Sequence, residues 1–211
     1  MLFRSDPRDD LLTDLVQARF DSGERVGQGL TMEEMLSIIE QLLVAGNETT
    51  TNLIAMAMQY LVENPNQMAK VRANRELIPN MLEEALRIEA PVQMLPRFAT
   101  KDAVVGGVEI PKGSVLMAMY ASAGRDERKF PNPDAFDVER DNARTHMAFG
   151  QGPHFCVGAA LARSEARIAY ELLLERLDNI AFAPVDEVMH RELSMTLRGL
   201  TKLELTFTKI K

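Results

Sequence analysis

The chain has 211 residues, of which 46% are hydrophobic and 26% are charged, so it is long and apolar enough to bury a core. A formal net charge of −7 and the lack of a basic run argue against a nucleic-acid partner. The opening MLFRSDPRDDLL is too charged for a signal peptide, and polar residues such as Asn47 and Glu48 interrupt the most apolar stretch, residues 42–62. We therefore expect a cytoplasmic protein without a membrane span.

Helical patterns fill the first ninety residues. Thr31 followed by Glu34 has the form of a capping box, and apolar residues at helical spacing then predict one long helix over residues 31–63. Asn64-Pro65 should end it. Shorter helices are expected over residues 11–20, directly after Pro65, and over residues 79–90.

The centre of the long helix is locally weak. In AGNETT, residues 45–50, Gly46 costs about 1 kcal/mol of helix stability relative to Ala. The hydroxyls of Thr49, Thr50 and Thr51 can hydrogen-bond to carbonyls one turn earlier and bend the axis. A weak centre can open a groove in a long helix, although a threonine run that is merely tolerated would look the same.

The helix over residues 79–90 carries a Glu–Arg pair. Glu84 and Arg87 are three residues apart and share one helix face. The neighbouring Glu83 is an alternative partner, but the spacing favours Glu84. An exposed pair of this kind contributes only about 0.2–0.5 kcal/mol, so the pattern alone is weak evidence for a site.

The second half of the chain begins with a β-pattern. Gly106-Gly107 separates two apolar runs and predicts a hairpin. An irregular, proline-containing stretch follows, and then a helix that reaches about residue 177. Near the end, Leu203, Leu205 and Phe207 alternate with polar residues and predict a half-buried strand. His190, in a polar stretch, is expected to be exposed.

Cys156 is the only cysteine of the chain. It lies in FGQGPHFCVG, residues 149–158, which we call the sulfur loop, directly before a helical run. A lone cysteine is often just a small buried hydrophobe, but the start of a helix favours a thiolate. Without a second cysteine, a disulfide within the chain, a zinc–cysteine cluster and an iron–sulfur cluster are excluded. A single axial thiolate to a haem iron remains.

The other residues of the sulfur loop suit a flat ligand. Gly150, Gly152 and Gly158 permit unusual backbone angles and a close approach of the chain to a cofactor. Phe149 and Phe155 offer ring faces to pack against it. Backbone N–H groups at the start of the following helix can hydrogen-bond the sulfur.

The sulfur loop resembles the signature Phe-x-x-Gly-x-His/Arg-x-Cys-x-Gly of the haem-thiolate monooxygenases, the cytochrome P-450 family. Its matching residues are Phe149, Gly152, His154, Cys156 and Gly158. AGNETT resembles the family's distal oxygen-binding helix, and the Glu-x-x-Arg motif occurs in the expected order. The resemblance implies a mainly α fold with small β-sheets, namely the C-terminal half of the P-450 fold, and haem b with the Cys156 thiolate as its axial ligand.

The resemblance also implies roles in the long helix. Glu48 and Thr49 would form an acid and alcohol pair that delivers protons on the oxygen side of the haem. A carboxylate that exchanges protons with water and a hydroxyl that both donates and accepts make a relay. Ala45 and Gly46 would keep side chains off the haem face.

The resemblance also implies roles for several charged residues outside the long helix. A buried Glu84–Arg87 pair would be completed by Arg140, and removing one member would cost several kcal/mol by stranding a charge. The trio would support folding and hold the sulfur loop. Arg97 and His154 match positions that contact the haem propionates, and a guanidinium fork suits a carboxylate.

The resemblance determines the roles of two further sets of residues less closely. The segment PVQMLPRF resembles one that lines the substrate pocket, which would place Val92, Met94 and Leu95 against substrate. Met and Leu clusters are more often ordinary core. His146 either packs beneath the sulfur loop or touches the haem edge, and its role stays open.

The implied activity is hydroxylation of a small apolar organic substrate by molecular oxygen. Electrons would come from NAD(P)H through a ferredoxin or a similar donor. A peroxide-driven haem-thiolate enzyme is an alternative activity. The presence of both Glu48 and Thr49 argues against it, because a proton relay is needed chiefly when dioxygen is the oxidant. A second alternative is a haem-binding or interaction fragment that does not turn over substrate.

Residues 1–211 resemble only the C-terminal, haem-binding portion of the family's domain. A complete member carries a further N-terminal half, which would contribute to the substrate roof and to the surface for the redox partner. We therefore count a missing N-terminal half among the possible partners.

Overall fold

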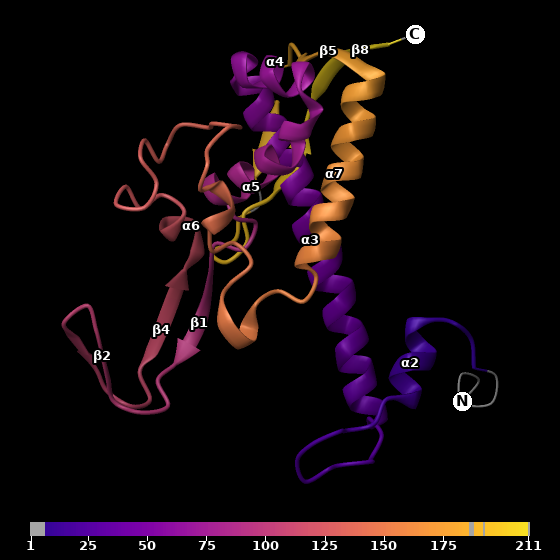
Figure 1. Cartoon of the computed structure of the whole chain (residues 1–211), viewed down its shortest axis with the longest axis vertical. Helices are drawn as coiled ribbons and strands as arrows, with labels where there is room; N and C mark the ends of the chain where they lie inside the picture. Colours follow the sequence, from indigo (N-terminus) through magenta and orange to yellow (C-terminus); the bar gives the residue numbers. More distant parts are fainter. Residues whose placement is uncertain (1–6, 186–187, 192, 211) are drawn as a thin grey trace. The chain divides into compact units, whose positions relative to one another are not determined.

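The computed structural model describes residues 7–185, 188–191 and 193–210. It divides into two compact units, Met1–Asn47 and Glu48–Lys211, and each is described by itself. Helix α3, Met32–Glu63, runs from the first unit into the second (Figure 1). Its bounds agree with the predicted helix over residues 31–63.

The first unit contains α2 and the start of α3. Helix α2 spans Leu11–Gln17 and ends before the predicted residue 20. The backbone turns extended at Ala18, and the Arg19 guanidinium donates hydrogen bonds to carbonyls of the last turn. The predicted capping box is present: the Thr31 N–H donates to Glu34 Oε2 at 2.8 Å, and the Glu34 N–H donates to Thr31 Oγ1 at 3.2 Å.

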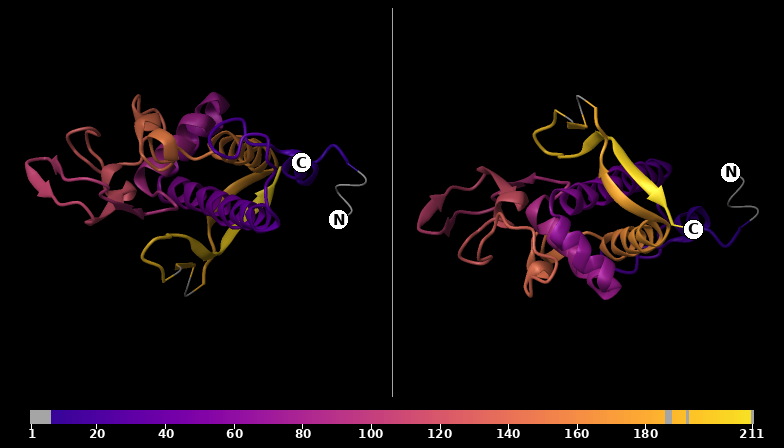
Figure 2. Two further views of the ribbon diagram at one scale, coloured as in Figure 1. Left: turned by 90° about the horizontal axis from the view of Figure 1, so that it is seen from below. Right: turned by 90° about the horizontal axis from the view of Figure 1, so that it is seen from above.

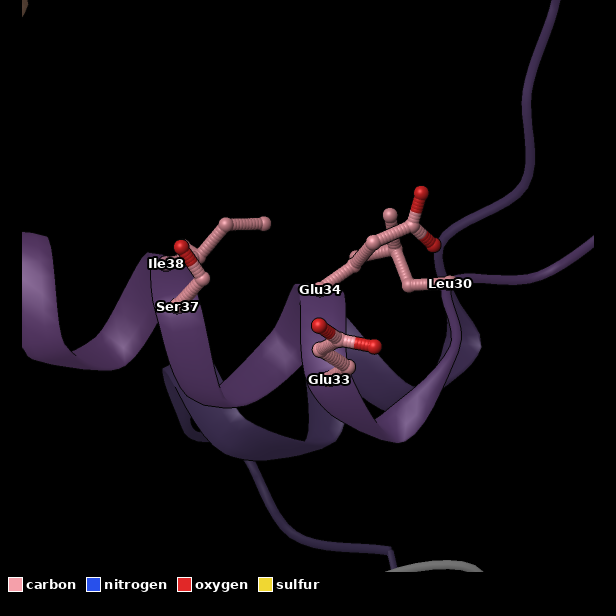
Figure 3. A pocket seen from close by; sticks show the side chains of 5 residues that line it. All are labelled: Leu30, Glu33, Glu34, Ser37 and Ile38. Carbon is pink, nitrogen blue, oxygen red and sulfur yellow. The ribbon is translucent and has the colours of Figure 1, made fainter.

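A shallow hollow lies at the beginning of α3 (Figure 3). It is lined by Leu30, Glu33, Glu34, Ser37 and Ile38. Hydrogen bonds from the Arg25 guanidinium and from Thr31 lower the pKa of Glu34 to about 2. The Glu34 carboxylate is already bound to Arg25 and to the Thr31 N–H. We therefore interpret the hollow as part of the capping structure at the start of α3.

The second unit is built on four helices. They are the rest of α3, α4 (Pro65–Ala73), α5 (Ile78–Ile88), which follows a 3-10 turn at Arg75–Leu77, and α7 (Ala159–Arg176). Helix α7 lies alongside the second part of α3 (Figures 1 and 2), where the Tyr170 hydroxyl donates to the carbonyl of Ile54 at 2.7 Å. Their apolar faces and that of α5 share one core, which includes Leu53, Ala57, Leu61, Met81, Ala85, Tyr170 and Leu174.

The strands of the described residues form antiparallel pairs. The predicted hairpin is β2 (Ala103–Val105) with β3 (Val108–Ile110), and the expected C-terminal strand is β8 (Leu205–Lys209). The partner strands were not predicted. They are β1 (Met94–Phe98) with β4 (Val115–Met119), β5 (Leu177–Phe182) with β8, and β6 (Met189–Arg191) with β7 (Leu200–Leu203).

Short helical turns connect these elements. They are α6 (Tyr120–Ala123) and the 3-10 turns Ala143–Thr145 and Gly152–His154. His190, in β6, is exposed as expected. No helix within the described ranges is long and apolar enough to cross a membrane.

Candidate active site

The sulfur loop is closed by its own backbone. The Cys156 N–H donates to the carbonyl oxygen of Phe149 at 2.9 Å, and the Ala159 N–H donates to the Cys156 carbonyl at 3.2 Å, where α7 begins. The Cys156 side chain is a free thiol and is exposed. The backbone therefore presents the sulfur at the start of a helix, as the sequence predicted.

Two of the three loop glycines adopt backbone angles that favour glycine. Gly150 has φ +71° and Gly152 has φ +68°, both in the left-handed region. Gly158 differs from the expectation, because its φ of −83° is open to any residue. A Cβ added at Gly158 would lie 3.9 Å from the Cys156 sulfur, an ordinary contact.

Apolar side chains flank the sulfur. Phe155 is 49% exposed and Val157 is 95% exposed. Phe149 is half-buried instead. The guanidinium carbon of Arg163 lies 4.5 Å from the centre of its ring, so one face of Phe149 makes a cation–π contact with this arginine. An exposed soft sulfur donor whose two sequence neighbours are exposed and apolar suits the iron of a flat, largely apolar porphyrin.

Arg97 and His154 lie on different elements. Arg97 is half-buried on β1 and donates to the Tyr120 hydroxyl at 2.9 Å and to the Pro96 carbonyl at 2.8 Å. Among the described residues its guanidinium forms no ion pair with a carboxylate, so its charge is compatible with an anionic ligand. His154 is exposed at the end of the 3-10 turn inside the sulfur loop.

The AGNETT segment is continuous α-helix. Glu48 and Thr49 are half-buried in the second unit, which also contains Cys156. Ala45 and Gly46 belong to the first unit and are exposed. Nothing lies within 4 Å of a Cβ added at Gly46.

Glu84 binds two arginines in the core. The side chains of Glu84 and Arg87 are both 0% exposed. Arg87 Nε donates to Glu84 Oε2 at 2.7 Å, and Arg140 Nε donates to Glu84 Oε1 at 2.9 Å. Glu84 is thus the partner of Arg87, as its spacing indicated, and Arg140 reaches the same carboxylate.

Both arginines also bind the chain that precedes the sulfur loop. Arg87 donates to the carbonyls of Gly124 and Pro133, each at 2.7 Å. Arg140 donates to the Pro131 carbonyl at 2.7 Å, and both reach the Ala135 carbonyl. We call Glu84, Arg87 and Arg140 the Glu84 brace. Every buried side-chain nitrogen and oxygen of the described residues has a hydrogen-bond partner, so the charges of the Glu84 brace are paired.

Glu83 forms a second network, which the sequence did not predict. Arg163 Nε donates to Glu83 Oε1 at 2.6 Å, and Arg163 Nη2 donates to Oε2 at 3.0 Å. His146 Nε2 lies 3.0 Å from Glu83 Oε2, while His146 Nδ1 accepts the Ala148 N–H at 3.0 Å. Because Nδ1 accepts, the ring proton lies on Nε2 and is donated to Glu83. His146 is buried and contacts the chain where the sulfur loop begins, through the Ala148 N–H and the Phe149 ring.

These contacts set the charge of the network. Burial alone would raise the pKa of Glu83, but hydrogen bonds from His146 and Arg163 outweigh it and lower the pKa to about 2. The pKa of Arg163 is raised, chiefly by its hydrogen bond to Glu83 and to a smaller extent by the nearby Cys156 sulfur. Glu83 is therefore a buried carboxylate that two neighbouring groups keep ionised.

A third carboxylate, Glu89, fixes the segment near the expected substrate residues. Tyr60 donates its hydroxyl to Glu89 Oε2 at 2.6 Å, and Arg191 and Arg198 both bind Oε1. Arg198 also donates its backbone N–H to the Pro91 carbonyl at 2.8 Å. The C-terminal segment is thereby held beside the residues that precede β1.

The expected substrate residues are unequally exposed. Val92 forms an isolated antiparallel bridge with Leu197 and is half-buried, as is Met94. Leu95 is exposed. The three follow one another closely, but on a strand their side chains point to alternate sides.

Comparison with known proteins identifies the family. The cytochrome P450 family model matches residues 3–205, nearly the whole chain. The chain belongs to the cytochrome P450 family. It is 44% identical over 205 residues to cytochrome P450 109 of Bacillus spizizenii, covering 97% of this chain and 49% of that protein. It is 45% identical over 209 residues to the cytochrome P450 monooxygenase PikC of Streptomyces venezuelae, covering 98% of this chain and 49% of PikC.

The fold agrees with the same family. The solved structure of the cytochrome P450 CYP109Q5 from Chondromyces apiculatus superposes with a TM-score of 0.89 at 42% identity, covering 99% of this chain and 52% of that one. The chain has a partial P450 fold, mainly α with small sheets, and its relatives are oxidoreductases of the haem-thiolate monooxygenase type. It spans about half the length of the relatives it matches.

Proposed function

We propose that residues 1–211 form the C-terminal, haem-binding portion of a P450 domain, in which the Cys156 thiolate is the axial ligand of haem b. The observation that carries the proposal is the exposed Cys156 thiol on a loop whose Gly150 and Gly152 are in the left-handed region. The apolar surface of Phe155 and Val157 beside the sulfur supports it as well. Phe149, Gly152 and Gly158 complete the loop.

When bound, haem supplies the oxygen-activating redox chemistry of the family. The chain's own residues hold the cofactor and deliver protons to the reaction. Cys156 places a thiolate at the start of α7, where the helix dipole favours a negative charge. The Glu48 carboxylate takes a proton from water and passes it to the Thr49 hydroxyl. The hydroxyl then gives up its own proton toward the side of the haem at which oxygen is activated.

The remaining assignments concern the edge and the face of the cofactor. The Arg97 guanidinium and the His154 ring bind the propionates, in keeping with the absence of a carboxylate partner for Arg97 among the described residues. Ala45 and Gly46 match family positions that leave the haem face clear, and neither carries a bulky side chain.

The reaction we propose is hydroxylation of a small apolar organic substrate by molecular oxygen. Val92, Met94 and Leu95 would contribute apolar contacts to the substrate. Electrons would reach the site from NAD(P)H through a ferredoxin or a similar donor, in the cytoplasm.

The test is oxygen consumption coupled to product. The chain is loaded with haem, supplied with ferredoxin, ferredoxin reductase and NADPH, and offered a panel of apolar substrates. We expect Thr49→Ala to consume oxygen with a much smaller share recovered as hydroxylated product, because the relay hydroxyl is lost. Thr51→Ala, two positions away on the same helix and exposed, is the matched control and should keep the wild-type coupling. Unchanged coupling in Thr49→Ala would contradict the relay.

A second candidate function is a haem-binding portion that turns over only with a partner. The chain spans about half the length of its relatives, and Leu43 and Val44 on α3 are 69% and 63% exposed. Its signature is turnover that appears only when a separately expressed N-terminal half of a relative is added. Turnover supported by hydrogen peroxide and not by the electron donor would point instead to a peroxide-driven enzyme.

A further inference from the structure

Helix α5 carries two adjacent carboxylates that face different segments. Consecutive residues on a helix point about 100° apart. Glu84 binds the segment before the sulfur loop through Arg87 and Arg140, whereas Glu83 binds His146 and Arg163. His146 lies before the sulfur loop in the sequence and Arg163 lies after it on α7. Glu83 therefore joins the two flanks of that loop.

We propose that Glu83, His146 and Arg163 are positioning residues that fix Phe149 and, through its backbone carbonyl, set the place of the Cys156 sulfur. We call these three residues the Glu83 cluster. It acts on the loop through two contacts, one to the ring of Phe149 and one to the amide of Ala148.

The contact to the Phe149 ring is made by Arg163. Two of its nitrogens bind the two oxygens of Glu83, which orients the plane of the guanidinium. That plane covers the Phe149 ring, with 4.5 Å between the guanidinium carbon and the ring centre. His146 contacts the same ring at 5.8 Å between centres. Phe149 is thus held on one side by an arginine whose own position Glu83 determines.

The contact to the backbone is made by His146. Its Nδ1 accepts the Ala148 N–H, one residue before Phe149, while its Nε2 is anchored on Glu83. The Phe149 carbonyl then accepts the Cys156 N–H at 2.9 Å. A continuous series of contacts therefore leads from the buried Glu83 carboxylate to the backbone of the sulfur-bearing residue.

The first test needs no cofactor. Hydrogen–deuterium exchange of the full chain reports the amides of residues 146–158, with β5 as the reference for global stability. We expect Arg163→Ala and His146→Ala to speed exchange of residues 146–158 by about tenfold or more, because each variant loses at least one hydrogen bond to the charged Glu83, with a smaller change in β5. Arg163→Lys keeps the charge but not the fork and should give an intermediate rate.

Arg167→Ala is the matched control for the exchange test. Arg167 lines the same small hollow as Glu83 and Arg163, but it pairs with Glu171 on its own helix at 2.7 Å. We expect this variant to exchange like the wild type. The proposal is overturned if residues 146–158 of Arg163→Ala exchange at the wild-type rate, or if β5 speeds up equally and the effect is only global.

The second test uses the haem-loaded chain and rests on the proposed function. Arg163→Ala should bind as much haem per chain as the wild type, while a smaller share of its reduced carbon monoxide complex absorbs at the thiolate position. Arg167→Ala should keep the wild-type share. An unchanged share in Arg163→Ala contradicts the positioning role. If the wild type itself shows no thiolate band, the proposed function fails, whereas the exchange result still decides whether the Glu83 cluster positions the loop.

Discussion

The Cys156 N–H donates a hydrogen bond to the carbonyl oxygen of Phe149 at 2.9 Å, and this contact closes the sulfur loop without using either side chain. The position of the sulfur is therefore determined by the backbone conformation between these two residues. That conformation depends on two glycines with positive φ, Gly150 and Gly152.

Replacing Gly150 by Ala should destabilise the folded chain. Its φ of +71° costs an alanine about 1–2 kcal/mol, and the new Cβ would lie 3.3 Å from the carbonyl oxygen of His154. Urea unfolding should show a loss of about that size. Gly158→Ala is the control, with a φ of −83° and an added Cβ 3.9 Å from the sulfur, and it should cost only about 0.5 kcal/mol, because alanine is a poorer N-cap of α7 than glycine. Equal losses in the two variants would refute the argument from backbone angle.

Arg140→Ala should be far more damaging than the loss of a surface ion pair. It strands the fully buried Glu84 with one of its two arginines missing, and breaking a buried pair costs about 3–5 kcal/mol. Lys70→Ala removes an exposed pair with Glu139 and should cost less than about 1 kcal/mol. The comparison is made by urea unfolding at pH 7, and similar losses would mean that the Glu84 brace is not what holds this region.

Gly124→Ala tests the close approach of two backbones. A Cβ at Gly124 would lie 2.0 Å from the carbonyl oxygen of Arg87, so the chain must shift where Arg87 is already bound. We expect a loss of about 3 kcal/mol or more. Gly46→Ala meets no atom within 4 Å and lies inside α3, so it should instead gain about 1 kcal/mol. Thermal unfolding of the two variants should shift in opposite directions.

Acid should weaken the Glu83 cluster in a defined range of pH. The pKa of Glu83 is lowered in the folded chain to about 2 from its ordinary value of 4.5, so its contribution to stability is complete above about pH 4.5 and is lost as the pH falls toward 2. Glu83→Gln should be less stable than the wild type at pH 7, and the gap should narrow through this range. Glu171→Gln, which removes the exposed partner of Arg167, should cost less than about 1 kcal/mol at pH 7. A constant gap for Glu83→Gln would contradict the lowered pKa.

Local patterns predicted the elements whose stabilising contacts are close in sequence. Thr31 and Glu34 form the capping box, and Glu84 with Arg87 is a pair three residues apart. The early end of α2 was missed, because it depends on how the Arg19 side chain folds back on its own helix, which hydrophobic spacing does not report.

The family resemblance paired the distant Arg140 and Glu84, but other contacts between distant residues were missed. Arg163 and Glu83 are 80 residues apart, and neither lies in a pattern that names the other. Strands β1 and β4 pair across the β2–β3 hairpin, so their pairing could not be read from either strand alone. The available signal was the pair of consecutive glutamates, Glu83 and Glu84, in the largely apolar run over residues 78–88, because a buried carboxylate needs a hydrogen-bonding partner.

The central claim, that Cys156 is the axial ligand of a haem, is tested most directly by carbon monoxide. The full chain is loaded with haem, reduced with dithionite and exposed to carbon monoxide, and the difference spectrum is recorded. We predict a Soret band at the red-shifted position of a thiolate-ligated haem, which Cys156→His abolishes. No band in the wild-type chain, or a band at the position typical of a histidine ligand, would contradict the claim.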